Sequence, residues 1–316
     1  MNEPDKQQIG EYEQLAHEII RLAPQAGVFS TKVPGMRIVR RETSEFLEHI
    51  LYPSSLCLIV KGRMQAFIGS EEYRCERGQL LLNCIEMPGY LRASADAGEP
   101  FLAFVIALDA NLLVRIFDEL TGRTEEVPVD SRGEASSFES WPAEYFGTER
   151  SVRTGEASLE QIRAFLHLAQ IADHADWARF IAPLILRELH YYLAAGPLGG
   201  YLHTFFSPSS QSRRIATAAA HMCGHCGERL RIEELARMVS MAESTFNRNF
   251  KKVTSLSPLQ YHKQLKLHEA RRLMSAENMS ASAACFAVGY ESQQQFTREY
   301  KRLFGRPPMK DVRRNS

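Results

Sequence analysis

Two segments near the end of the chain share a pattern of aromatic and basic residues that suits contact with a polyanion. Residues 245–251 (Thr-Phe-Asn-Arg-Asn-Phe-Lys) and residues 295–301 (Gln-Phe-Thr-Arg-Glu-Tyr-Lys) both fit Phe-x-Arg-x-aromatic-Lys. In a helix the two aromatic residues of each segment share one face, because they lie four positions apart, and the arginine points elsewhere. Arginine can donate two hydrogen bonds to guanine, so the repeat predicts a paired DNA reader.

The predicted reading residues form two matching stripes, at i, i+4 and i+8, opposite the aromatic face. They are Ser244, Arg248 and Lys252 in the first helix and Gln294, Arg298 and Arg302 in the second. We expect the central arginines to contact guanine, Gln294 to contact adenine, and the last residue of each stripe to contact phosphate. The alternative for the arginines is a phosphate contact or a surface ion pair. Gln293 competes with Gln294, and Thr245 and Asn247 are weaker candidates.

The charge of the chain is divided between its two parts. From residue 209 to the end there are 19 Lys and Arg against 9 Asp and Glu, a net charge of +10, whereas the first 208 residues carry −10. A basic C-terminal module attached to an acidic N-terminal one favours double-stranded DNA as a partner of the former.

Composition places the chain among soluble globular proteins of two or three domains, since it has 316 residues and 44% hydrophobic residues. No run approaches the roughly 18 apolar residues of a membrane span. The first residues lack the basic-then-apolar order of a signal peptide, so we expect a cytoplasmic protein without membrane contact. Its six cysteines are irregularly spaced and are typical of reduced thiols.

The N-terminal part changes from a helix at residues 11–22 to short apolar or alternating runs that predict strands. These runs are residues 55–60, 63–68, 73–75, 80–82 and 101–108. Turn residues separate them at Lys61-Gly62, Gly69-Ser70, Arg77-Gly78 and Pro88-Gly89. This spacing is typical of a small β barrel or sandwich.

Helical patterns follow the strands. Asp109 is a good N-cap for a helix that ends at residue 120, residues 121–155 have no clear period, and two further helices are predicted at 158–171 and 177–193. The apolar faces of the last two need a partner, either the barrel or a second copy of the chain. We therefore expect three parts: 1–120, a loop and helical linker or dimerisation segment at 121–200, and 201–316.

The basic module contains two predicted helix-turn-helix units. Helices at 230–239 and 243–253 form the first unit, and helices at 280–288 and 292–304 form the second. A capping box at residues 257–260 opens a connecting helix that ends near Met274. Its length of about 25 Å would place two reading helices in successive major grooves of one DNA face.

The chain resembles AraC-type transcriptional regulators over about 100 C-terminal residues. The segments that carry the resemblance are residues 248–251 (RNFK), 257–261 (SPLQY), 263–267 (KQLKL), 269–273 (EARRL), 288–292 (VGYES) and 296–305 (FTREYKRLFG). A looser resemblance to one AraC subgroup covers residues 56–62, 107–109, 183–189 and 196–199.

This resemblance implies an α+β multidomain protein with an N-terminal cupin-like barrel, a helical dimerisation segment and an all-α C-terminal domain. It further implies a ligand-responsive, homodimeric, bacterial regulator that uses Ser244, Arg248, Gln294 and Arg298 to read DNA. The small-molecule effector is left open, no cofactor is expected, and RNA polymerase is a possible further partner. Two departures from the family pattern, Ala242 at the first N-cap and Ser240 in the preceding turn, predict a softer first unit.

Three other functions compete with this interpretation, one of them a DNA-binding architectural or accessory factor that has no ligand. Cupin-type enzymes hold a metal with clustered histidines, but residues 53–165 contain none, so we expect neither a metal site nor catalysis. The third alternative is a DNA-binding redox or aldehyde sensor that uses barrel thiols, with Cys57, Cys75 and Cys84 as candidates. The segment at residues 221–226 (HMCGHC) contains two histidines and two cysteines. It could bind zinc or act as a redox pair, although packing is the expected role of its cysteines.

Overall fold

The computed structural model describes residues 3–42, 46–69, 71–95, 98–122, 150–207 and 209–312. Two antiparallel sheets form a barrel-like domain, one with the strand order β1-β2-β9-β4-β7-β10 and the other with the order β3-β8-β5-β6. The strands are β1 (Gly27–Ser30), β2 (Met36–Arg41), β3 (Phe46–Tyr52), β4 (Ser55–Lys61), β5 (Arg63–Ile68), β6 (Glu71–Glu76), β7 (Gln79–Asn83), β8 (Met87–Ser94), β9 (Phe101–Ala107) and β10 (Val152–Glu156).

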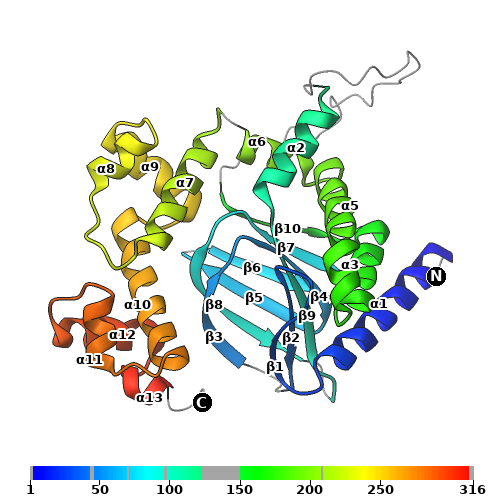
Figure 1. Ribbon diagram of the computed structural model, residues 1–316, viewed down its shortest axis with the longest axis horizontal. Helices are drawn as coiled ribbons and strands as arrows, with labels where there is room; N and C mark the ends of the chain where they lie inside the picture. Colours follow the sequence, from blue (N-terminus) through cyan, green and yellow to red (C-terminus); the bar gives the residue numbers. More distant parts are fainter. Residues whose placement is uncertain are drawn as a thin grey trace.

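The helices lie on two sides of this barrel (Figure 1). On one side are α1 (Glu3–Leu22), α3 (Leu159–Ile171) and α5 (Ala182–Ala195). The other helices of the N-terminal part are α2 (Ala110–Leu120), α4 (Ala175–Phe180) and α6 (Gly199–Phe206). On the opposite side is the C-terminal domain, with α7 (Gln211–Gly224), α8 (Ile232–Met238), α9 (Glu243–Thr254), α10 (Pro258–Ala276), α11 (Ala281–Ala287), α12 (Gln293–Phe304) and α13 (Pro308–Val312).

This arrangement confirms the predicted α+β fold with a β-rich N-terminal domain and a helical C-terminal domain. The local signals for several helix starts are also confirmed. The Asp109 carboxylate accepts hydrogen bonds from two amides of α2, and Ser257 and Gln260 form the predicted capping box of α10. The positions of the two boundaries between the three predicted parts remain predictions.

Several local predictions were wrong. Pro88 and Gly89 lie within β8 rather than in a turn. A Cβ at Gly89 would lie 2.4 Å from the Phe67 carbonyl oxygen, so glycine at this position allows β8 to approach β5 closely. The helix predicted at 177–193 divides at Ile181, since Pro183 is suited only to the first turn of α5. Strands β1, β2, β3 and β8 were not predicted, and β10 occupies the end of the predicted loop at 121–155. Most of that loop lies outside the described residues.

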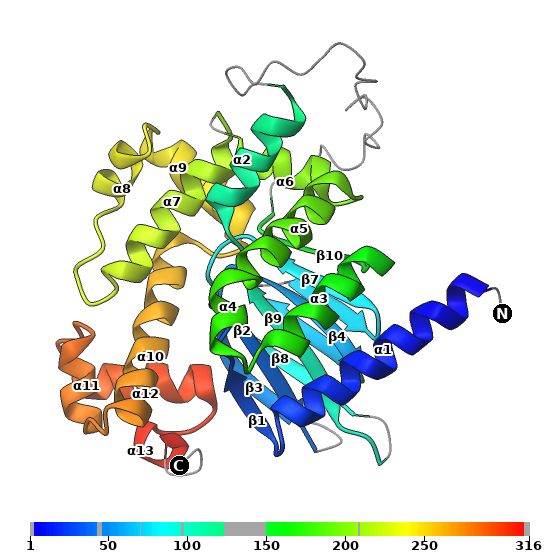
Figure 2. The ribbon, with the colours of Figure 1, turned by 45° about the vertical axis from the view of Figure 1, so that its right-hand side comes forward.

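The two domains pack against each other through the four-stranded sheet. Helix α10, which connects the two helix-turn-helix units, packs beside β3 and β8, and both views show these elements side by side (Figures 1 and 2). The Arg271 guanidinium on α10 donates a hydrogen bond of 2.9 Å to the backbone oxygen of His49 on β3. Within the described part of the chain, none of the helices combines the length and apolarity required to cross a bilayer.

Candidate DNA-binding surface and effector cavity

The predicted reading stripes are exposed on α9 and α12. Ser244, Arg248 and Lys252 on α9, and Gln293, Gln294, Arg298 and Arg302 on α12, all have solvent-exposed side chains. Neither Arg248 nor Arg298 makes a hydrogen bond or ion pair with any residue that the structure describes. Two further candidates differ: Thr245 is half-buried, and the Asn247 amide donates to the Glu243 backbone oxygen at 3.0 Å.

Buried aromatic residues fix the direction in which these stripes point. Phe246 and Phe250 of α9 and Phe296 and Tyr300 of α12 are each 0% exposed, and Phe304 is 7% exposed. Within each helix successive rings are in contact, with centroids 5.5 Å apart for Phe246 and Phe250 and 5.6 Å apart for Phe296 and Tyr300. Because the aromatic side of each helix is held in the core, the opposite stripe faces solvent as predicted.

Glu299 holds the second recognition helix through three side chains. Its carboxylate accepts hydrogen bonds from the Tyr290 hydroxyl at 2.8 Å and from the Gln295 amide at 3.2 Å, and it pairs with the Lys263 ammonium at 3.2 Å. Burial of Glu299 acts to raise the pKa of its carboxyl, but these three partners lower it overall. The network joins α12 to its preceding turn and to α10.

A cavity of about 360 Å³ lies between the two sheets of the barrel. On the larger sheet, Arg37, Val105, Cys57 and Leu81 are cross-strand neighbours from β2, β9, β4 and β7, and all line the cavity. Met64 and Leu91 line it from the smaller sheet. This predominantly apolar lining is typical of a small-molecule site.

Two arginines on β2 place positive charge in this apolar wall. Arg41 is paired with the Glu48 carboxylate at 3.0 Å. Arg37 lies four residues before Arg41 on the same face of β2. It is half-buried and makes no hydrogen bond or ion pair within the described residues. A cation that is half removed from water and unpaired is costly, so Arg37 marks a position where an anion would be stabilised.

The cavity wall also contains several buried polar atoms that lack a hydrogen-bond partner among the described residues. They are His49 Nδ1, the Tyr52 hydroxyl, Asn83 Oδ1 and His268 Nε2. Burial lowers the pKa of His268 to about 3 and also lowers that of His49, which keeps both imidazoles neutral at pH 7. Unsatisfied atoms are concentrated here, which is typical of a binding site rather than of a plain core.

The barrel thiols lie in surroundings that oppose reactivity. Cys57, Cys75 and Cys84 are buried, and burial raises the pKa of each to about 12. The thiolate is the nucleophilic form, so these thiols are held in their unreactive state at neutral pH. Three cations of the barrel that could lower the pKa of a thiol have other partners: Lys61 pairs with Glu99, Arg74 pairs with Glu72, and Arg77 lies over the Tyr12 ring.

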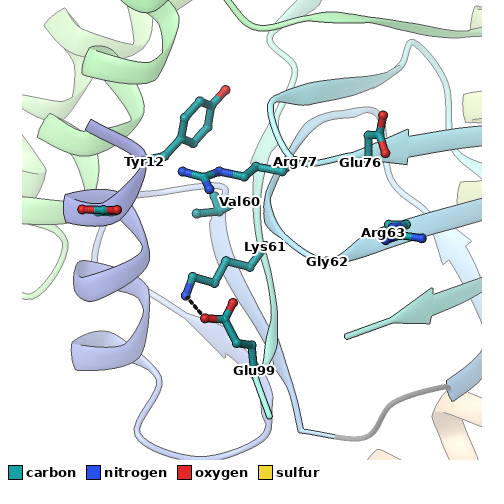
Figure 3. Close-up of a pocket in the computed structure, with 9 residues that line it drawn as sticks. Tyr12, Val60, Lys61, Gly62, Arg63, Glu76, Arg77 and Glu99 are labelled. Atoms are coloured by element: carbon teal, nitrogen blue, oxygen red, sulfur yellow. Dashed lines mark ion pairs between the residues drawn. The ribbon is translucent and has the colours of Figure 1, made fainter. Parts of the chain in front are cut away.

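A second hollow, of about 370 Å³, lies between α1 and the barrel (Figure 3). Charged side chains of both signs line it, and two of its cations already have partners. The Lys61 ammonium lies 3.1 Å from a Glu99 carboxylate oxygen, and the Arg77 guanidinium lies 5.2 Å from the Tyr12 ring centroid. The paired charges and the open polar lining make this hollow a weaker candidate for an effector than the barrel cavity.

In the cluster at residues 221–226 the two histidines are exposed and the two cysteines are half-buried. The His221 and His225 rings stack with centroids 4.1 Å apart, and the Cys223 sulfur lies 3.4 Å from the Tyr261 hydroxyl. Burial raises the pKa of Cys223 to about 12. Among the described residues there is no group of three or more side chains placed to hold a metal ion.

Sequence patterns did not predict most residues of the cavity, although Cys57, which lines it, was a candidate thiol. Arg37, Arg41, His49 and His268 are far apart along the chain, and charged residues are usually expected on an outer face. One available signal was the alternation in residues 36–41 (MRIVRR), where Met36 and Ile38 occupy one face and Arg37 and Arg41 the other.

Comparisons with known proteins agree with this architecture. Residues 32–201 match the family model of the AraC-type transcriptional regulator N-terminus, and residues 235–314 match that of a helix-turn-helix domain. Solved structures of ToxT from Vibrio cholerae share the fold, with a TM-score of 0.57 at 9% identity over 88% of this chain and 97% of that one.

Curated relatives match about a third of this chain. An uncharacterized HTH-type transcriptional regulator YobQ of Bacillus subtilis is 33% identical over 98 residues, or 31% of this chain and 40% of the relative. The MmsAB operon regulatory protein of Pseudomonas aeruginosa is 29% identical over 89 residues, or 28% of this chain and 29% of the relative. Each match thus spans less than half of the relative. The N-terminal family match, however, covers more than half of the present chain, which therefore belongs to the AraC-type transcriptional regulators.

Proposed function

We propose that this regulator binds specific DNA sequences with α9 and α12 in successive major grooves. The observation that carries the proposal is the pair of exposed stripes at matching positions of two helices whose aromatic faces are buried. Arg248 and Arg298 have no competing partner among the described residues, so both guanidinium groups are free to donate two hydrogen bonds to guanine. Lys252 and Arg302, at the end of each stripe, are assigned to phosphate, while Ser244, Gln294 and Gln293 are assigned to base edges.

The test separates base reading from charge attraction. A cognate site is selected from a random DNA library with the full chain, and affinities for that site and for an unrelated duplex are measured by fluorescence anisotropy. Arg298→Ala should weaken the cognate site by about 1–3 kcal/mol and the unrelated duplex much less. Arg214→Ala, which removes an exposed arginine of α7, is the matched control. Equal losses on both duplexes would reassign Arg298 to phosphate contact.

We propose that the response to a small molecule begins in the barrel cavity. The proposed effector is an organic anion whose remaining atoms are mostly apolar. Arg37 supplies an unpaired cation, and Val105, Leu91 and Met64 supply an apolar wall. An unsaturated fatty acid is bound in one ToxT structure, and this bears on the present chain only as an example of such a ligand in a protein of the same fold.

Decanoate, decanol and decylamine serve as probes of this effector class. Calorimetry with the full chain should detect decanoate binding and much weaker binding of decanol and decylamine. Arg37→Met should reduce the decanoate affinity at least about tenfold, because one charge-assisted pair is worth about 1.5–3 kcal/mol. Arg92→Met, on the exposed outer surface of β8, should not change it. Equal binding of all three probes would contradict the assignment of Arg37 as the anion contact.

A homodimer is proposed through the outer face of α4 and α5. Trp177, Phe180, Leu184 and Tyr191 are 55%, 64%, 64% and 45% exposed, although they are large apolar or aromatic residues. Leu184 and Tyr191 lie seven positions apart and share one face of α5, whereas Ile185 and Leu189 on another face of that helix are buried. A face of this kind suits the self-complementary contact of a twofold dimer.

Sedimentation of the full chain tests the dimer. Leu184→Glu should shift the protein toward a monomer, because a charge would be desolvated in the contact. Phe286→Glu changes a residue of α11 that is 59% exposed and is the matched control. A monomeric wild-type chain at micromolar concentration would rule the proposal out. The remaining expectations, that the protein works in the cytoplasm without catalytic activity and that it contacts RNA polymerase, are kept as proposals of the same kind.

A further inference from the structure

The barrel holds the C-terminal ends of both recognition helices, but it does so in two different ways. At the end of α9, the Ser151 backbone N–H donates a hydrogen bond of 3.0 Å to the Val253 carbonyl oxygen. At the end of α12, the Phe304 ring makes edge contacts with two imidazoles, His49 of β3 at 5.5 Å and His268 of α10 at 5.2 Å between centroids. The first contact is made by backbone atoms and the second by aromatic side chains.

Only the second contact borders the effector cavity. His49 and His268 line that cavity, whereas Ser151 and Val253 do not. Among the described residues that line it, His268 is the one supplied by the C-terminal domain. A single layer of imidazoles therefore lies between the cavity and the last residue of the second recognition helix.

Arg271 joins the same residues from the other side. Its guanidinium donates to the His49 backbone oxygen at 2.9 Å, pairs with the Asp311 carboxylate at 2.9 Å, and lies 5.0 Å from the Phe304 ring centroid. One side chain thus connects β3, α13 and the end of α12. A shift of β3 or of its imidazole would move the surroundings of Phe304, because packed side chains transmit displacement.

Each of the two imidazoles has a ring nitrogen that makes no hydrogen bond with the described residues. His49 Nδ1 and His268 Nε2 are buried without partners among the described residues, and each such atom costs about 1–3 kcal/mol. A second arrangement that satisfies one of them therefore needs little additional free energy. A ligand can change the structure of a protein by binding only if a second arrangement of similar free energy exists.

We propose that His49 and His268 transmit occupation of the barrel cavity to the C-terminal end of α12, and thereby act on the second recognition helix more than on the first. The inference rests on the proposed role of the cavity as the effector site. It assigns both histidines as positioning residues for α12. It also predicts that an effector changes the contribution of Gln294 and Arg298 to DNA binding more than that of Arg248.

Hydrogen exchange in the full chain tests the proposal without an identified effector. Ala103→Leu fills part of the cavity from β9, and Val105→Leu does so from the same strand if the first variant fails to fold. We expect exchange of the amides at residues 301–304 to change by at least about threefold, and that of residues 251–254 to change by less than twofold. Equal changes at the two helix ends, or no change at α12, would overturn the inference.

A second substitution identifies the path. Combined with Ala103→Leu, His268→Leu should abolish the change at residues 301–304. His262→Leu should preserve it, since His262 is also buried on α10 but neither lines the cavity nor contacts Phe304. Transmission that persists in the His268→Leu variant would assign the coupling to other contacts and refute the role of His268.

Decanoate separates this inference from the proposed effector class. If calorimetry shows that decanoate binds at Arg37 but exchange at α12 stays unchanged, the coupling is refuted and the site stands. If decanoate does not bind but the filled cavity alters α12 and not α9, the coupling stands and the proposed ligand class is wrong.

Discussion

The two helix-turn-helix units carry equivalent elements, but the second has the residues that its backbone requires and the first does not. The turn of the second unit has Gly289 at a φ of +72°, whereas the first has Ser240 at +54°. The second recognition helix ends with Gly305 at +76°, and the first ends with Ser255 at +61°. A residue with a Cβ in this left-handed region costs roughly 1–2 kcal/mol, so the first unit has backbone strain at both places.

The helix starts and the interiors differ in the same direction. The Ser292 hydroxyl accepts a hydrogen bond from the Gln295 backbone N–H at the start of α12, but Ala242 has no side-chain acceptor to offer α9. At the repeat position where Glu299 binds three side chains, the first unit has Asn249, whose buried amide nitrogen has no partner among the described residues.

The second unit is therefore stabilised by its own local interactions, whereas the first depends more on packing against the barrel. The end of α9 receives the Ser151 hydrogen bond, and the Ser255 side chain packs so closely against the barrel loop that a Cβ at Gly69 would lie 2.6 Å from it. We expect the first unit to exchange its amides faster once it is detached from these contacts. Equal protection of α9 and α12 would contradict the comparison.

The largest effect is expected from Gly289→Ala. The new Cβ would lie 2.3 Å from the Gly227 carbonyl oxygen on a backbone of positive φ, so both the clash and the conformation are unfavourable. We expect the free energy of unfolding to fall by about 3 kcal/mol, measured by chemical denaturation. Ser240→Ala, at the corresponding turn, is the control and should change it by less than about 0.5 kcal/mol. A small effect of Gly289→Ala would show that the second turn is not under the tighter constraint.

Much of this comparison was predictable from the sequence, because it depends on local chemistry. The repeat placed Phe246, Phe250, Phe296 and Tyr300 in the core, and the structure confirms that burial. The absent cap at Ala242 was also read from one position. Helix periodicity and capping act within a few residues, which is why one sequence suffices to detect them.

The effector cavity was not predictable in the same way. Arg37 and His268 are brought together by the pairing of β2 in the larger sheet and by the packing of α10 on the barrel, and neither is encoded within a short window. Strand β2 itself was missed because three arginines in six residues conceal its alternation. Charged residues that face inward contradict the usual pattern, and such exceptions mark functional sites.

The next largest effect is expected at the repeat position occupied by Asn249 and Glu299. Glu299→Leu leaves the Tyr290 hydroxyl and the Lys263 ammonium without their partner, and it should lower the free energy of unfolding by about 2 kcal/mol. Asn249→Leu removes an unsatisfied buried amide and should be neutral or stabilising. Both are measured by urea denaturation at one pH. Similar losses in the two variants would remove this part of the distinction between the units.

Acidification should weaken the contacts of His268, on α10 near the second unit, over a wider pH range than those of His262, on α10 near the first unit. Burial lowers the pKa of His268 to about 3 and that of His262 to about 4, so the unfolded chain binds a proton below about pH 6.5 that the folded chain does not. Stability is therefore lost as the pH falls from about 6.5 toward each folded pKa, by about 1 kcal/mol per pH unit for each histidine. His268→Leu should flatten the measured dependence between pH 6 and pH 4 by about that amount. An unchanged slope would mean that His268 is protonated in the folded protein.

Exchanging the N-caps should shift stability in opposite directions in the two units. Ala242→Ser supplies an acceptor to the start of α9 and should add about 1 kcal/mol, while Ser292→Ala should remove about the same amount from α12. Hydrogen exchange of the first turn of each helix gives the local effect, and thermal denaturation gives the global one. The comparison fails if Ala242→Ser leaves the protection of α9 unchanged, because another group would then already satisfy those amides.

The smallest effect is expected at the C-terminal ends of the recognition helices. Ser255→Gly relieves a left-handed backbone but increases the entropy of the unfolded chain, so we expect a gain of only about 0.5 kcal/mol. Gly305→Ala introduces the same strain with no atom within 4 Å of the new Cβ, and it should cost about 1 kcal/mol from conformation alone.

Because Gly305 follows Phe304, its substitution also tests the coupling: decanoate or Ala103→Leu should alter exchange at residues 301–304 less in Gly305→Ala than in the wild-type chain. A larger change in that variant would indicate that the end of α12 is held by its cap rather than by the imidazoles.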